Sequence, residues 1–403
     1  MFKKKSHFAL LGATVLGAAV LVACGGGGGD TAPATPVSTA GTLAVSLTDA
    51  PACGFDAVNV TVSKVRVHRS DSALDTEPGW TDITLNPARK INLLNLTNGV
   101  LEALGQTSLE AGRYTQMRLV LDANAGGTAN TVVPLDGRAE LPLETPSAVQ
   151  SGIKLVGAFE VNAGQKTEVV LDFDACKSVV TRGKGSYALK PVVKVVPVAA
   201  NGISGFVSTA VLGSGVQVSA QQNGSIVSAT TPNPATGEFF LSRLAPGNYD
   251  VVITADNSAA SVVAAVPVAS TTSTTVLSTL MSPILLAPGN TGAIGGTVTM
   301  TPAGAEPAFV AAKQSFAAGP TVTIKYAGAD LASGAYTIAN LPVSTPQFAS
   351  YSATLPLSFS ASSAAPAGKY RVEASATGYA AKAVDGVDIG SSNQSNVNFA
   401  LSR

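Results

Sequence analysis

Residues 55–68 read FDAVNVTVSKVRVH, with valine at positions 58, 60, 62, 65 and 67. Apolar residues at every second position mark a β-strand with one face on a core, because successive side chains of a strand point to opposite sides. The segment GTLAVSLTD at 41–49 repeats this pattern with Leu43, Val45 and Leu47. Both segments are therefore predicted to be strands.

The same alternation continues along the chain. Further strands are predicted at 83–85, 114–121, 131–133, 154–161, 167–173 and 189–196, separated by Gly, Asn, Asp and Pro. The exception is Leu93–Leu104, where leucine spacing approaches that of a helix. We expect one short helix at about Asn98–Leu104 in an otherwise all-β first domain.

Length and charge limit the classes of protein to consider. A chain of 403 residues is long for one domain, and we expect three. Charged residues make up only 12%, and basic and acidic residues number 25 each. Removal of Lys3, Lys4 and Lys5 with a leader would leave an acidic excess, and no other basic run exists. Nucleic acid is therefore excluded as a partner.

The N-terminus has the features of an export signal. Lys3 to Lys5 precede an apolar stretch at 8–22, which is shorter than the roughly 20 residues of a membrane-spanning helix. Leu21, Val22, Ala23 and Cys24 resemble the lipobox of bacterial lipoproteins. We expect a signal peptide at 1–23, acylation of Cys24 and a flexible Gly/Pro/Thr tether at 24–40. The alternative is an ordinary secretory signal in which Cys24 is incidental.

The expected anchor also predicts where the protein resides. Two or three acyl chains on one cysteine hold a protein almost permanently on a bilayer, so the predicted partner is membrane lipid in the cell envelope. Gly25 stands where an inner-membrane retention signal would have Asp, which favours the outer membrane. An envelope protein or a glycan is a further candidate partner, and the oligomeric state is left open.

Four motifs in residues 41–198 resemble the family called domain of unknown function 4382. They are Leu47 to Pro51, Lys64 to His68, Asn92 to Gly99 and Leu171 to Cys176. The resemblance implies a β-sandwich carried by surface lipoproteins, and it implies no reaction.

Charged residues become sparser after Asn201, which marks a domain boundary. Residues 202–282 resemble the carboxypeptidase regulatory-like domain through Ile203 to Val207 and Gly237 to Ile253. Residues 290–403 repeat this pattern more loosely, with an insert expected at about 306–335. The overall expectation is tandem β-sandwich domains, immunoglobulin-like or prealbumin-like.

A Gly-x-Tyr sequence recurs in all three units, ending at Tyr114, Tyr249 and Tyr370. Glycine permits a turn with positive φ, and the tyrosine ring packs on a core while its hydroxyl finds an acceptor at the rim. We predict that the three tyrosines occupy corresponding strands. The alternative is that Gly-x-Tyr is simply common where strands begin.

The remaining cysteines, Cys53 and Cys176, are a pair in an exported chain, which predicts a disulfide. In the chain-entropy model, closing so long a loop stabilises by roughly 4–5 kcal/mol. The alternatives are two buried free thiols or, less simply, a catalytic cysteine, for which the expected mature chain offers only His68 as a base.

The disulfide would bring Asp49, Asp56, Asp172 and Asp174 towards one region, where four carboxylates could bind Ca²⁺. No spacing matches a calcium loop, so the simpler interpretation is a solvated or turn-capping role, with Asp172 and Asp174 flanking Phe173 on the outer face of a strand. No other cofactor is expected. Trp80, the only tryptophan, could stack on a sugar or a peptide, or anchor the edge of the core.

These features indicate a membrane-anchored, non-enzymatic envelope or surface lipoprotein for display, structure or ligand binding. Two alternatives stay open. One is a calcium- or carbohydrate-binding module, and the other is a hydrolase accessory protein or a cryptic enzyme.

Overall fold

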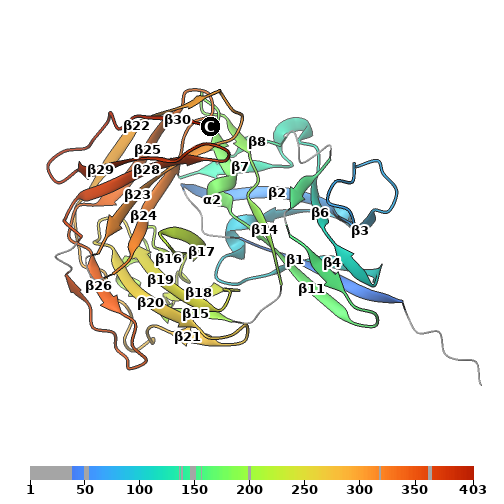
Figure 1. The fold of residues 1–403 in the computed structure, drawn as a ribbon, viewed down its shortest axis with the longest axis horizontal. Coiled ribbons are helices and arrows are strands. Elements are labelled where there is room, and N and C mark those ends of the chain that lie inside the picture. The colour runs from blue at the N-terminus through green and yellow to red at the C-terminus, as the bar shows by residue number, and fades with distance from the viewer. Residues whose placement is uncertain are drawn as a thin grey trace, which may run out of the picture. The chain divides into compact units, whose positions relative to one another are not determined.

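The computed structural model describes residues 39–49, 54–135, 137, 139–145, 151–155, 157–197, 201–316, 319–361 and 365–403. Within them, Thr39–Arg403 is one compact unit made almost entirely of strands (Figure 1). None of the helices in these ranges has the length and apolarity of a membrane span. The predicted signal peptide, Cys24, most of the tether, and Cys53 lie outside the described residues.

The first β unit contains the elements from β1 to β14. They are β1 (Ala40–Asp49), β2 (Phe55–His68), β3 (Thr81–Asn92), η1 (Leu93–Leu96), β4 (Glu102–Glu110), β5 (Gly112–Tyr114), β6 (Gln116–Leu121), η2 (Ala125–Gly127), β7 (Thr131–Pro134), β8 (Leu141–Glu144), β9 (Ile153–Leu155), β10 (Phe159–Val161), β11 (Lys166–Phe173), α2 (Ala175–Ser178), β12 (Val179–Thr181), β13 (Tyr187–Leu189) and β14 (Val193–Pro197).

The alternating apolar residues of the first unit face its core, as the periodicity predicts. Leu43, Val45 and Leu47 of β1 are buried, and so are the alternating valines of β2. One sheet has the order β14-β11-β1-β4, and the other runs β12-β13-β8-β7-β2-β6-β9 with β3 beside β2. Their facing apolar side chains form one hydrophobic cluster. The predicted all-β fold class is confirmed.

The second and third units are smaller. The second contains β15 (Gly202–Phe206), η3 (Thr209–Val211), β16 (Gln217–Gln222), β17 (Ser225–Thr230), β18 (Glu238–Ser242), β19 (Gly247–Thr254), β20 (Ser261–Val268) and β21 (Thr274–Val276). The third contains β22 (Thr291–Thr301), β23 (Ala308–Ser315), β24 (Thr321–Gly328), β25 (Ala335–Pro342), β26 (Gln347–Ser350), β27 (Ser360–Ala361), β28 (Lys369–Ala376), β29 (Lys382–Asp388) and β30 (Phe399–Ser402).

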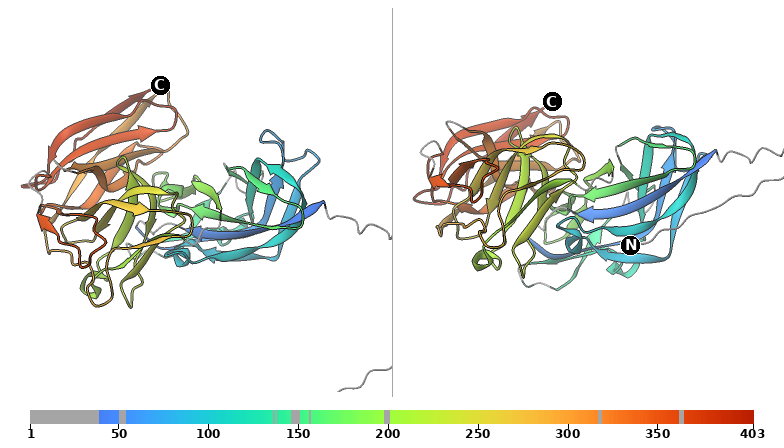
Figure 2. Two further views of the ribbon diagram at one scale, coloured as in Figure 1. Left: turned by 60° about the horizontal axis from the view of Figure 1, so that its bottom comes forward. Right: turned by 90° about the horizontal axis from the view of Figure 1, so that it is seen from below.

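All three units share one strand arrangement. Figure 2 shows the ribbon of the chain from two further sides. In each unit the first strand lies between an antiparallel neighbour and a later parallel one: β1 between β4 and β11, β15 between β18 and β21, and β22 between β25 and β30. The opposing sheets contain the rows β3-β2-β6-β9, β17-β16-β19-β20 and β24-β23-β28-β29. The tandem sandwiches are therefore three versions of one topology.

Two of the three tyrosines occupy corresponding strands in this topology, and the third directly precedes the corresponding strand. Tyr249 and Tyr370 lie near the start of β19 and β28, and Tyr114 ends β5 immediately before β6. All three are buried, and the glycine two residues earlier has a positive φ each time. The hydroxyls of Tyr114 and Tyr249 donate to the carbonyl four residues back, at 3.0 and 2.8 Å. The predicted correspondence is confirmed for Tyr249 and Tyr370, whereas Tyr114 lies on β5, which pairs with β10 outside the β3-β2-β6-β9 row.

The expected helix at Asn98–Leu104 is wrong. The helical turn lies earlier, at Leu93–Leu96, and residues from Glu102 onwards form strand β4. Asn98 and Gly99 have φ of 61° and 82°, so they reverse the chain and end any helix before it reaches Leu101. The leucine spacing arises because a short turn and a strand both bury leucine on one core.

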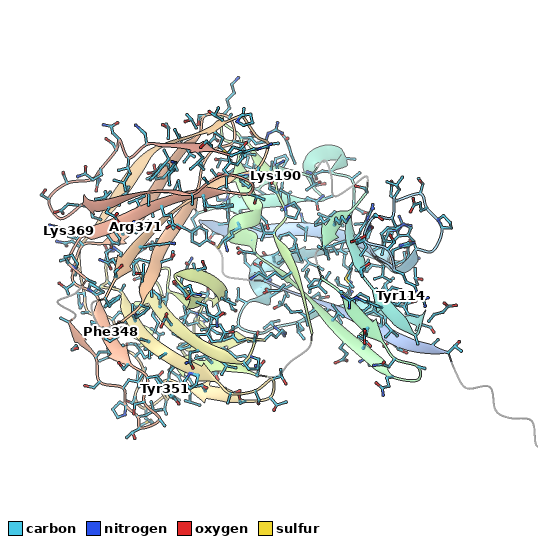
Figure 3. All side chains as sticks on the ribbon, in the orientation of Figure 1. Tyr114, Lys190, Phe348, Tyr351, Lys369 and Arg371 are labelled. Carbon is cyan, nitrogen blue, oxygen red and sulfur yellow. The ribbon has the colours of Figure 1, made fainter. Side chains whose placement is uncertain are left out.

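The insert expected at about 306–335 also lies elsewhere. That range contains β23 and β24, a hairpin in the main sheet of the third unit. The actual insert carries β26 and β27, and β26 extends the second unit's sheet by pairing in parallel with β20. Phe348 of this insert packs on the third core and Tyr351 on the second (Figure 3). The insert therefore ties the two units together.

Candidate functional site

The first and second units are joined by the turn at Asn98. Its backbone N–H donates to Thr230 Oγ1 at 2.8 Å, and its side-chain Nδ2 donates to the carbonyl of Glu238 at 3.1 Å. Its Oδ1 accepts from the backbone N–H of Phe240. The side-chain amide thus bonds the backbone of β18 as a neighbouring strand would.

The first and third units are joined through Asp330. Its Oδ2 accepts from the backbone N–H of Gly183 at 2.7 Å, and the N–H of Leu331 donates to the carbonyl of Thr181 at 3.1 Å. Burial raises the pKa of Asp330, but hydrogen bonds from Ser333, Gly183 and Thr181 outweigh it and lower this pKa to about 2. The carboxylate therefore stays charged, and keeps this contact, at every physiological pH.

The second and third units are joined through buried Gln221. Its Nε2 donates to the carbonyl of Thr323 at 2.7 Å, and its Oε1 accepts from the N–H of Thr323 at 2.8 Å. Lys325 of the third unit also pairs with Asp256 of the second at 2.9 Å. Every pair of units therefore shares directed polar contacts.

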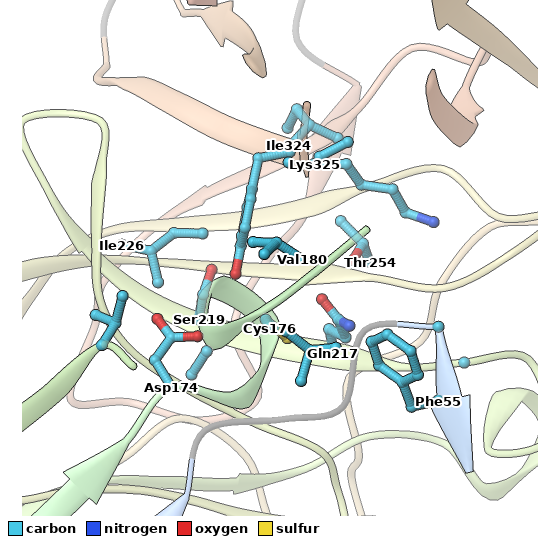
Figure 4. A pocket seen from close by; sticks show the side chains of 18 of the residues that line it. Phe55, Asp174, Cys176, Val180, Gln217, Ser219, Ile226, Thr254, Ile324 and Lys325 are labelled. Carbon is cyan, nitrogen blue, oxygen red and sulfur yellow. The ribbon is translucent and has the colours of Figure 1, made fainter. Parts of the chain in front are cut away.

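A cavity of about 400 Å³ lies where the three units meet, and it is the candidate site. Figure 4 shows side chains from every unit around it. The first unit contributes Phe55, Asp174 and Val180, the second Gln217, Ser219, Ile226 and Thr254, and the third Ile324 and Lys325. Mixed apolar and polar walls of this size are typical of small-molecule sites.

Asp172 gives the cavity its unusual chemistry. It lies on the outer face of β11, as predicted, but residues 226–229 of the second unit line the same space, so it is partly buried instead of solvated. Among the described residues, no hydrogen-bond donor contacts its carboxylate. Burial raises its pKa to about 6, although Lys194, Arg243 and Lys177 act in the opposite direction. The ionised form of Asp172 therefore lowers the free energy of unfolding of the protein.

We expect Asp172→Asn to stabilise the protein at pH 7.5 by about 1–3 kcal/mol. A carboxyl whose folded pKa is raised from 3.8 to about 6 destabilises the fold when ionised, and this penalty disappears as pH falls through that interval. The difference between variant and wild type should therefore vanish near pH 4. Denaturant unfolding at both pH values measures it, and equal stability at pH 7.5 would contradict the assignment.

The four aspartates considered for calcium do not form a cluster. Asp49 Oδ1 accepts from the N–H of Ala175, and Asp174 caps α2 through the N–H of Lys177, each at 3.0 Å. Asp174 also pairs with the Lys177 ammonium, and Asp56 is exposed. The described residues contain no group of three or more His, Cys, Asp or Glu side chains able to hold a metal ion. These residues therefore do not provide the calcium site that was considered.

Cys176 lies in α2, lines the cavity and is disulfide-bonded. Cys53, the expected partner, lies outside the described residues, so the pairing with Cys53 stays a prediction.

Trp80 holds a loop against the outer face of the first unit. The guanidinium carbons of Arg66 and Arg118 lie 4.8 and 4.7 Å from its ring centroid, and the His68 ring lies 5.1 Å away. Its Nε1 donates to the carbonyl of Leu74 at 2.8 Å. These contacts take up the ring surface that a sugar would need, so Trp80 acts as an anchor.

Sequence reasoning missed three important polar residues, Asn98, Lys194 and Arg243. The Asn-Gly dipeptide at 98–99 is a turn signal that could have located the first of them. Arg243 and Lys194 carry no local signal, because the groups they act on, Asp172 and the backbone of another unit, are distant in the sequence or become neighbours only in the fold.

Comparison with known proteins agrees with the motifs of the first unit. Residues 40–191 match the family described as Domain of unknown function (DUF4382). A comparison with curated proteins gives no match.

Among solved structures, the chain is similar to the TIE protein of Bacillus anthracis, with 11% identity over 90% of this chain and 51% of that one, and a TM-score of 0.16. It thus spans about half the length of the TIE chain. The major pilin SpaA of Corynebacterium diphtheriae gives 10% identity, 90% and 100% coverage and a TM-score of 0.19. The major pilin BcpA of Bacillus cereus is 11% identical, with 90% of this chain and 99% of that chain covered and a TM-score of 0.15. TM-scores this low carry no argument about function.

Proposed function

We propose that the protein is a lipid-anchored, non-enzymatic protein of the cell envelope that presents three joined β units outside the membrane. The anchor is the acylated Cys24, which follows the Lys3 to Lys5 run and the apolar stretch at 8–22. Each buried methylene contributes about 0.8 kcal/mol, so two or three chains make attachment effectively permanent. Gly25 in place of Asp favours the outer membrane.

The observation that carries the structural role is the set of contacts between the units. Asn98, Asp330 and Gln221 each bond backbone atoms of another unit, and β26 extends a neighbour's sheet. Domains linked by flexible tethers lack such bonds, since domain motion is the default without a large interface. The three units therefore form one compact unit, which suits display or support at a surface.

The surroundings of His68 support a role without catalysis. Its Nδ1 accepts from the N–H of Ser70 at 3.0 Å, and its Nε2 lies 3.1 Å from the carbonyl of Pro78. With both ring nitrogens bonded to backbone, His68 is poorly placed to act as a general base.

The shared topology of the second and third units supports the proposed relation to carboxypeptidase regulatory-like domains, which are small seven-stranded sandwiches. A carbohydrate-binding role through Trp80 is less well supported, because protein side chains surround its ring.

The anchor is tested with Cys24→Ala in full-length protein expressed in a Gram-negative host. We expect wild type to be found entirely in the membrane fraction, with an N-terminal peptide that begins at an acylated Cys24. The variant should lack the acyl mass and its membrane attachment through lipid. Ser38→Ala, in the same segment, is the matched control. An unmodified N-terminus cut elsewhere in wild type would make this a freely secreted protein and overturn the proposal.

A further inference from the structure

The junction cavity has the size and lining of a ligand site. Its volume of about 400 Å³ lies within the range of small-molecule pockets. Val180, Ile226 and Ile324, one from each unit, form apolar surface within it. A ligand there would contact all three units at once.

The charged groups around the cavity are already engaged, apart from Asp172. The Lys325 ammonium pairs with Asp256 at 2.9 Å, and Asp174 pairs with Lys177 at 3.0 Å. Lys194, directly opposite Asp172 in the sheet, donates to the carbonyl of Val227 at 3.0 Å.

Arg243 is a further cation whose charge reaches Asp172. It donates instead to Ser242 Oγ at 2.8 Å and to the carbonyl of Gly99 at 3.3 Å. Three cations, Lys194, Lys177 and Arg243, attract the Asp172 carboxylate, and one like charge, Asp174, repels it. No described residue donates a hydrogen bond to this carboxylate.

We propose that the cavity binds a small organic cation, a primary or secondary ammonium on an apolar body. The ammonium donates to the Asp172 carboxylate, and the apolar body lies against Val180, Ile226 and Ile324. This inference goes beyond the proposed envelope role and does not depend on the anchor.

Anions and metal ions fit the same walls less well. A ligand carboxylate would meet Asp172 and Asp174 as like charges, while Lys325 and Lys194 are held by their own acceptors. A metal ion would need further carboxylate or imidazole ligands, and the described residues bring no third one together. An ammonium needs a single carboxylate and tolerates apolar surroundings. Lys194, Lys177 and Arg243 carry like charge, but their donors bond Val227, Asp174 and Ser242, which leaves the Asp172 carboxylate open to the ligand.

The test uses calorimetric titration of the purified chain that begins at Thr39, which is one compact unit. The probes are tryptamine, phenethylamine and hexylamine, each compared with the alcohol and the carboxylate that share its apolar body. We expect at least one amine to bind at pH 7.5, about tenfold or more tighter than its alcohol and carboxylate counterparts. Binding should weaken about tenfold at pH 5, because protonated Asp172 cannot accept from an ammonium.

Two variants locate the site. Asp172→Asn keeps the shape of the side chain and should weaken amine binding at least tenfold while circular dichroism shows an intact fold. Asp56→Asn removes an exposed carboxylate that follows the cavity residue Phe55 in the chain but does not line the cavity, and it should change binding less than twofold. The proposal is overturned if no amine binds, if an alcohol or carboxylate binds as tightly as its amine, or if Asp172→Asn leaves amine binding unchanged.

Discussion

Replacing Gly237 with alanine is expected to destabilise the second β unit by more than about 3 kcal/mol. Gly237 has a φ of +75°, where an added Cβ is strained, and that Cβ would lie 2.0 Å from the carbonyl oxygen of Val207. The carbonyl of Gly237 also accepts from the N–H of Val207 at 2.9 Å, so the turn cannot move away without losing that bond.

The third unit contains the same turn and offers an independent copy of the experiment. Gly334 has a φ of +70°, and its added Cβ would lie 2.3 Å from the carbonyl oxygen of Val298. Its carbonyl accepts from the N–H of Val298 at 2.8 Å. Gly334→Ala should therefore destabilise the third unit by a similar amount.

Gly213→Ala is the matched control, because nothing lies within 4 Å of its added Cβ and its φ is not positive. Differential scanning calorimetry of the three variants measures the effect. If the free energy of unfolding of Gly237→Ala lies within about 1 kcal/mol of that of Gly213→Ala, the turn accommodates a Cβ and this prediction is wrong.

Asn98→Ala is expected to weaken the contact between the first and second units by about 2–4 kcal/mol. It removes the bonds to the Glu238 carbonyl and the Phe240 N–H, and it places alanine at a φ of 61°. The amide of Phe240 should then exchange with deuterium much faster, which hydrogen-exchange mass spectrometry detects.

Asn98→Gly separates the two causes, because glycine accepts the left-handed backbone but has no amide. In Asn98→Gly the Phe240 amide should lose its protection from hydrogen exchange as fully as in Asn98→Ala. The contact between the units should be weakened by about 1 kcal/mol less than in Asn98→Ala. Unchanged exchange at Phe240 in both variants would show that the side chain does not hold the units together.

Local sequence accounts for most of the strands. Period-two valine and leucine located β1, β2 and β11, because a half-buried strand leaves its pattern in consecutive residues. The Gly-x-Tyr sequences located corresponding strands in the second and third units and a strand start in the first, since turn chemistry and ring burial are local requirements. The leucine spacing predicted the wrong structure at 98–104, because leucines from a helical turn and from a strand together imitate helical spacing.

The all-β class and the recurring units could thus be predicted from residues close in the chain, because alternation and turn residues express short-range geometry. The cavity, the partial burial of Asp172 and the new partners of Asn98 could not. Asp172 lies on the predicted outer face, and only the packing of residues 226–229 from another unit partly buries it there. Asn98 accepts a hydrogen bond from Phe240, which lies 142 residues further along the chain. Such contacts depend on how the folded sheets of different units pack against one another, and the periodicity of the sequence does not predict that packing.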